Sequence, residues 1–258
     1  ILMRVAQDYG NPPVRVPREH PLAPRWGPLR QRVSQALAGL ALLLSHALFK
    51  SALFLVVGII DRQLSTRDLR ELSGLGRQAP VLATVSIVAV ASMVGVIPTL
   101  GFVGKETALA ALLTEAENGS VWGLVALIGI LLGSILTAAY GARFVWGAFW
   151  SKKDADGGMK PRTEWPTPPI GFVVSPLVLA GLTVVAGFAA PALDRAFALY
   201  ADLSPVSSPG IAAPEYPGYL ALWHGLELEL ILLTCTLVIG LAVLWLTDLR
   251  DLAARMLP

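Results

Sequence analysis

Two groups of ionisable residues interrupt long apolar stretches of this sequence. His46 and Lys50 stand four residues apart in one stretch, and Lys105 and Glu106 are adjacent in another. Residues four apart share one face of a helix. An imidazole titrates near neutral pH, and a desolvated lysine gives up its proton more readily than one in water. His46 and Lys50 therefore predict a proton relay; the alternative is a lysine that extends to the membrane interface and a histidine that bonds a neighbouring helix.

The stretch around Lys105 is too long for one membrane-spanning helix. Residues 80–116 would extend about 55 Å as a single helix, against roughly 30 Å of hydrocarbon. Helix-breaking residues lie at its centre, at Pro98, Gly101 and Gly104. We therefore expect two half-helices, over 80–97 and 104–116, with Lys105 at the N-terminus of the second, where the helix dipole disfavours a cation. The alternative is a plain loop that leaves Lys105 in water.

Three further ionisable residues give weaker signals. Arg143 lies about two turns from the end of its apolar stretch, where extension to the interface or a structural pair is expected. His224 and Glu227 are three apart, hence on one helix face near the outer end of the last stretch, which fits an interfacial hydrogen bond or a relay. No metal-binding cluster, P-loop or dinucleotide motif occurs, so we expect neither metal nor cofactor.

The composition determines the class of protein. Hydrophobic residues make up 55% of the 258 residues and charged residues 15%, with a mean hydropathy of +0.64. A soluble domain carries about 25% charged residues, and disordered chains are poor in apolar ones. A formal charge of +2 is far too small for a nucleic-acid-binding protein. The sequence predicts an all-α integral membrane helical bundle that binds no nucleic acid.

About five spans are expected, one of them the broken helix. They are Ser34–Ile60, Pro80–Ala116, Val121–Trp150, Ile170–Ala190 and Tyr219–Leu246. Basic residues concentrate in loops 61–78 and 151–169 and in the C-terminal tail, whereas the alternate loops hold only Arg195. By the positive-inside rule, those two loops and the C-terminus are cytoplasmic in a multi-pass protein of the cell membrane.

Residues 1–33 do not fit this arrangement. They are rich in arginine and proline and lack both helical periodicity and a signal-peptide core. With five crossings, their arginines would fall on the wrong side of the membrane. We interpret the segment as a non-native or truncated start; the alternative is a basic tail that binds anionic lipid.

Several motifs resemble one family of membrane proteins. They are Ser45-His-Ala-Leu-Phe-Lys50 continuing to Asp61, Thr66-Arg-Asp68, Leu72-Ser-Gly-Leu75, Gly101-Phe-Val-Gly-Lys105-Glu106, Leu136 to Arg143, and Leu222-Trp-His-Gly225. Over about residues 36–246, the chain is similar to the antiporter-like subunits of Mrp-type cation/proton antiporters and respiratory complex I. The stretch up to Asp61, with Thr66-Arg-Asp68 and Leu222-Trp-His-Gly225, looks most like the large A-type component of the Mrp (or Mnh) sodium/proton antiporter.

The resemblance implies half of an antiporter-like module. Core helices with the broken helix would occupy 34–150, and further membrane helices with polar loops 151–258, after the non-matching segment 1–33. His46, Lys50, Lys105 and Glu106 would belong to a proton relay in a transport subunit, not an enzyme. Its partners would be H⁺, Na⁺ or another monovalent cation, the lipid bilayer and other subunits of a hetero-oligomeric antiporter complex.

Two other functions remain open from the sequence. The same helices could pump protons in a complex I-like or hydrogenase complex, whose partner subunits would supply the electrons. Alternatively, the chain could be a non-transporting helical scaffold whose buried lysines pair only with partner chains. The resemblance also implies an earlier repeat that this chain lacks, so we expect a fragment that cannot complete a transport cycle alone.

Overall fold

The computed structural model describes residues 23–152, 158–201 and 220–256. Within these ranges the chain forms helices joined by loops, and no strand occurs. The sequence prediction of an all-α membrane bundle with a broken helix is confirmed for this part of the chain. The elements in chain order are α2 (Ala23–Leu64), the short 3-10 helix η1 (Leu75–Arg77), α3 (Pro80–Val94), α4 (Leu100–Glu117), α5 (Val121–Phe149), α6 (Ile170–Phe188), α7 (Ala190–Ala201) and α8 (Leu228–Met256).

Four of these helices are long and apolar enough to cross a membrane. The crossing segments are Gln35–Leu64, Val121–Phe149, Ile170–Phe188 and Leu228–Thr247. Their outward faces are strongly apolar: 72% of Phe54 on α2 is exposed, and 82% of Trp122 on α5. Such surfaces are stable in lipid rather than in water. Helix α3 is also apolar but shorter than these four.

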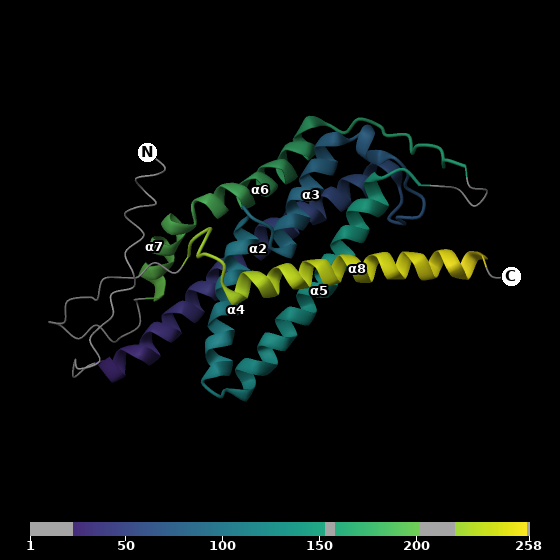
Figure 1. The fold of residues 1–258 in the computed structure, drawn as a ribbon. Helices are drawn as coiled ribbons and strands as arrows, with labels where there is room; N and C mark the ends of the chain where they lie inside the picture. Colours follow the sequence, from purple (N-terminus) through teal and green to yellow (C-terminus); the bar gives the residue numbers. More distant parts are fainter. Residues whose placement is uncertain (1–22, 153–157, 202–219, 257–258) are drawn as a thin grey trace.

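Helix α2 lies at the centre of the bundle, where it packs against α3, α4 and α6. Helices α4 and α5 form a hairpin, and α8 crosses α5 (Figure 1). Because α4 contacts α2, α5 and α8, side chains from distant parts of the sequence converge on it.

The interruption between α3 and α4 has a clear local cause. Gly95 ends α3 with a φ of 95°, a left-handed conformation that favours glycine. The Thr99 hydroxyl then caps α4 by accepting a hydrogen bond from the Phe102 amide. The break therefore runs from Gly95 to Thr99, before the expected position, and the second half-helix begins at Leu100 rather than at residue 104.

Other boundaries also differ from the sequence prediction. Helix α2 begins at Ala23, although no helix was expected before residue 34; residues 1–22 lie outside the described part of the chain. A loop was expected from residue 191, but Ala190–Ala201 forms α7, because a proline is tolerated in the first turn of a helix. The last helix starts at Leu228, not at Tyr219.

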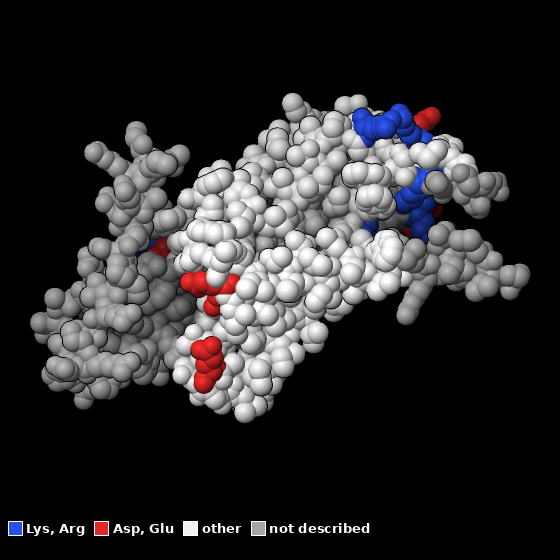
Figure 2. All heavy atoms as spheres, viewed as in Figure 1, with Lys and Arg blue, Asp and Glu red and all other residues white. Residues whose placement is uncertain are grey.

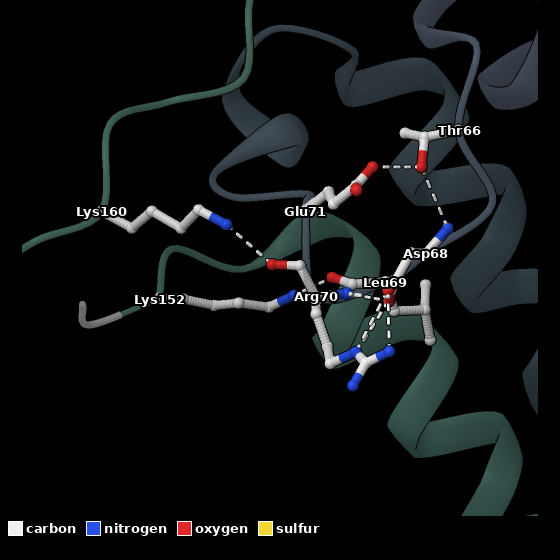
Figure 3. A network of polar contacts seen from close by, with 7 residues as sticks. All are labelled: Thr66, Asp68, Leu69, Arg70, Glu71, Lys152 and Lys160. Atoms are coloured by element: carbon white, nitrogen blue, oxygen red, sulfur yellow. Dashed lines mark hydrogen bonds and ion pairs between the residues drawn. The ribbon is translucent and has the colours of Figure 1, made fainter. Parts of the chain in front are cut away.

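Most basic side chains of the bundle lie at one end. They belong to the loop after α2 and to the loop between α5 and α6, whereas acidic side chains lie on the same face towards the α4–α5 turn (Figure 2). The two loops are tied together: the Lys160 ammonium donates to the Arg70 carbonyl over 2.7 Å, and the Lys152 ammonium to the Leu69 carbonyl (Figure 3). The basic end is thus an ordered assembly of two loops.

One carboxylate organises the first of these loops. Asp68 accepts hydrogen bonds from the backbone amide of Arg70 over 2.8 Å and from its guanidinium over about 3 Å, as Figure 3 shows. The Asp68 amide in turn donates to the Thr66 hydroxyl over 3.2 Å. The side-chain hydrogen bond from Arg70, reinforced by its amide, holds the pKa of Asp68 below the ordinary value of 3.8.

This pKa shift predicts an acid-sensitive loop. Because the folded-state pKa is below the unfolded one, Asp68 contributes stability above pH 3.8, and that contribution is lost as the pH falls through the folded pKa. Thermal unfolding of the complete subunit should therefore give a lower midpoint for Asp68→Asn than for the wild type at neutral pH. The difference should shrink in acid; a difference that stays constant with pH would contradict the assignment.

Candidate functional site

A cavity opens between α2, α3, α4 and α5. Its volume is about 390 Å³. Two of its walls carry residues predicted for the proton relay: His46 and Lys50 from α2, and Lys105 from α4. The remaining lining is Leu42, Ser45, Phe49, Ser92, Met93, Gly101, Ile130, Gly133, Ser134, Thr137 and Tyr140. The structure thus brings together three ionisable side chains from two separate sequence motifs.

The two residues of α2 face this cavity because they are one helical turn apart. The His46 ring contacts Phe49, with 5.2 Å between ring centroids. The Lys50 ammonium lies 6.0 Å from the centroid of the Tyr140 ring, at the limit for a cation–π contact. A second cavity of about 220 Å³ begins at Lys50 and continues along Phe144. Lys50 therefore lies where two cavities meet.

Lys105 does not lie where the sequence predicted. Because α4 begins at Leu100, Lys105 is in the second turn rather than at the N-terminus. Its ammonium crosses the break and donates a hydrogen bond of 3.0 Å to the carbonyl of Val94, the last residue of α3. The C-terminal end of a helix dipole favours a cation. This contact with the end of α3 was not expected from the sequence, and it joins the two half-helices through this side chain.

Glu106 pairs with His224. The His224 Nδ1 and the Glu106 Oε2 are 3.1 Å apart, and only 5% of the glutamate side chain is exposed. Neither residue lines the cavity. His224 precedes α8 instead of lying on it, so the predicted helix face shared with Glu227 is wrong. Glu227 and Arg143 are both exposed and outside the cavity.

Sequence reasoning missed the polar wall contributed by α5. Ser134, Thr137 and Tyr140 follow one another at intervals of three and line the same cavity. That spacing places them on one helix face, so the signal was present in the sequence. The Tyr140 hydroxyl donates to the Met93 sulfur over 3.2 Å. Opposite this wall, the buried Ser92 hydroxyl has no hydrogen-bond partner among the described residues.

The arrangement suits proton transfer better than bond-making chemistry. The cavity is lined mostly by apolar surface, but it has room for water, and its hydroxyl, imidazole and ammonium groups can order that water and exchange protons with it. Within the described ranges, no group of three or more His, Cys, Asp or Glu side chains is placed to hold a metal ion.

Known proteins share this sequence pattern. A family described as "NADH:quinone oxidoreductase/Mrp antiporter, TM" matches residues 32–137, which include His46, Lys50, Lys105 and the break between α3 and α4. The A-type component of the Na⁺/H⁺ antiporter of Alkalihalophilus pseudofirmus is 34% identical over 73% of this chain and 24% of its own length. The probable A/B-type component of a K⁺/H⁺ antiporter of Rhizobium meliloti is 33% identical over 76% of this chain and 19% of its own.

A comparison of structures points to the same family of antiporter proteins. A chain of the Mrp complex from Dietzia sp. DQ12-45-1b superimposes with a TM-score of 0.66 and 30% identity, over 84% of this chain and 22% of that one. This chain therefore spans about a quarter of the length of the proteins it matches. It is a multi-pass membrane protein of the Mrp-type antiporter family, and it corresponds to part of the large A-type component.

Proposed function

We propose that this chain is part of a proton-conducting subunit of a monovalent cation/proton antiporter. The observation that carries the proposal is the shared cavity, because His46, Lys50 and Lys105 reach it from two helices. Relatives named as Na⁺/H⁺ and K⁺/H⁺ antiporter subunits support the class of transport. Protons would pass between the three groups through water in the cavity, coupled to Na⁺ or a similar cation by other subunits of the complex.

The proposed orientation in the membrane follows from the charge at the basic end. Loops 61–78 and 151–169 each carry four arginines and lysines in the sequence, and such basic loops stay in the cytoplasm. We therefore assign this end and the C-terminus to the cytoplasm of a cell-membrane protein. Cysteines introduced in these loops should react with a membrane-impermeant thiol reagent in inverted vesicles and not in intact cells.

Lys50→Met tests the proton path directly. Methionine keeps most of the length of the side chain but carries no exchangeable proton, so Na⁺-dependent proton flux in inverted vesicles should fall roughly a hundredfold. The complete subunit in its assembled complex is required. Lys160→Met, which removes a lysine from the basic end, is the matched control and should leave the flux unchanged. Full flux in Lys50→Met would contradict the proposal.

A proton-pumping subunit of a redox complex is the second candidate. It is favoured by the matching family, whose description includes NADH:quinone oxidoreductase. Co-purification separates the two: iron–sulfur or quinone-reducing partners would favour the redox complex, and small hydrophobic antiporter subunits the antiporter. A scaffold without transport would keep residues 50 and 105 dry, so cysteines placed there would not react with a water-soluble thiol reagent.

A further inference from the structure

A short segment before α8 is fastened across the end of α4. Residues 220–227, here called the strap, lead into α8. At its start, the Leu220 amide donates to the carboxylate of Asp194 on α7 over 3.2 Å, and the Leu220 side chain is buried in the same apolar cluster as Phe102 of α4. The strap is thus tied to α7 by a hydrogen bond and packs in the apolar cluster to which α4 also contributes.

The strap presents His224 to Glu106. Gly225 turns the chain directly after His224, with a φ of 109° that favours glycine. The histidine Nδ1 lies 3.1 Å from the Glu106 Oε2. Exposure differs sharply within the pair: 30% of the His224 side chain is exposed, against 5% for Glu106. The imidazole is therefore in contact with both the exterior and a carboxylate that solvent barely reaches.

A carboxylate this buried needs a partner that can exchange protons with water. A histidine can take up a proton on one ring nitrogen and release another from the second nitrogen near neutral pH. Glu106 also directly follows Lys105, whose side chain lines the cavity. A proton delivered to Glu106 is then one residue away from the group at the break between the half-helices.

We propose that His224 is the proton-exchange residue through which Glu106 communicates with the surface at the strap. A proton from water binds Nε2 of the neutral ring, and the Nδ1 proton passes to Oε2 of the Glu106 carboxylate. The ring is neutral before and after, and tautomer exchange through water restores it; the reverse order releases a proton. This step rests on the proposed function, because it supplies the relay of the cavity.

Other ionisable groups on the neighbouring elements bear on its pH dependence. Together with His224 and Glu106, the described ionisable side chains on α4, on the helices around it and on the strap are Asp61, Arg62, His46 and Lys50 of α2, Lys105, Glu115 and Glu117 of α4, Tyr140 and Arg143 of α5, Asp194 and Arg195 of α7, Glu227 of the strap, and Glu229 and Cys235 of α8. His46 and His224 are the histidines among them.

The test uses His224→Gln and His224→Asn in the complete subunit within the assembled complex. Either amide can donate a hydrogen bond to Glu106 but cannot relay a proton. Na⁺-dependent proton flux in inverted vesicles should fall about tenfold or more. In a plot of flux against pH, the change in flux near neutral pH that depends on His224 should disappear. Added 4-methylimidazole should restore part of the flux. Leu226→Ala, an exposed change in the strap, is the matched control and should behave as the wild type.

The outcomes separate this inference from the proposed function. Wild-type flux and pH profile in both His224 variants, with Lys50→Met inactive, would overturn the role of His224 and leave the cavity relay standing. Wild-type flux in Lys50→Met as well would overturn both. Two further results would show that His224 only holds the structure together, and either would overturn the proposal. One is reduced flux that 4-methylimidazole does not rescue and that leaves the shape of the pH profile unchanged. The other is loss of the assembled complex in both variants.

Discussion

Lys105→Ala in the complete subunit is expected to reduce Na⁺-dependent proton flux to the background of vesicles that lack the complex. Lys105 is the group on α4 that both lines the cavity and bridges the break, through its 3.0 Å hydrogen bond to the Val94 carbonyl. Its loss removes a protonatable site between the half-helices. Flux is measured as dissipation of a pH gradient when Na⁺ is added to inverted vesicles. Unaltered flux would count decisively against the proposed function.

The alanine variant also leaves the Val94 carbonyl without its donor, which costs about 1–3 kcal/mol. Lys105→Gln separates the two roles, because its amide can donate to the carbonyl but cannot exchange a proton. We expect Lys105→Gln to assemble like the wild type and to be as inactive as Lys105→Ala. Restored flux in Lys105→Gln would show that Lys105 acts only by joining α3 to α4.

Gly101→Ala is expected to disrupt the broken helix. A Cβ atom on Gly101 would lie 1.7 Å from the backbone carbonyl oxygen of Ser92 and 2.9 Å from its hydroxyl. Backbone atoms cannot move aside as a flexible side chain does, so α3 and α4 would have to separate. Overpacking of this kind costs about 3 kcal/mol. The measurements are the thermal unfolding midpoint and the yield of assembled complex.

Gly129→Ala is the matched control for this variant. A Cβ atom on Gly129 of α5 meets nothing within 4 Å, and alanine suits a helix better than glycine does. Its unfolding midpoint should equal or exceed that of the wild type. If Gly101→Ala were as stable as Gly129→Ala, the close contact between Gly101 and Ser92 would not be what holds the half-helices together.

Local patterns predicted much of the architecture. Long apolar stretches place α5, α6 and the apolar part of α2 close to their expected bounds, since helix length in lipid follows directly from the run of apolar residues. The break was also expected, because proline and glycine interrupt a stretch too long for one crossing. Its exact position was not: Pro98 suggested a later break, whereas the left-handed Gly95 ends α3.

The helix α7 and the start of α8 show where composition misleads. Residues 191–218 are rich in proline, serine and glycine as a whole, yet the first of them continue as a helix against α2 and α6. Averages over a long segment conceal a short amphipathic helix within it. The apolar residues before Leu228 likewise extend the hydropathy signal of the last span, although Leu220 packs in the core outside any helix.

Residue types and their spacing within single elements were enough to predict a helical membrane protein in which His46 and Lys50 share one helix face. Tertiary structure alone decided that Lys105 joins them at one cavity, that its ammonium reaches Val94, and that Glu106 meets His224. The physical reason is that contacts across 118 residues of sequence follow from how whole helices pack, which no local periodicity encodes.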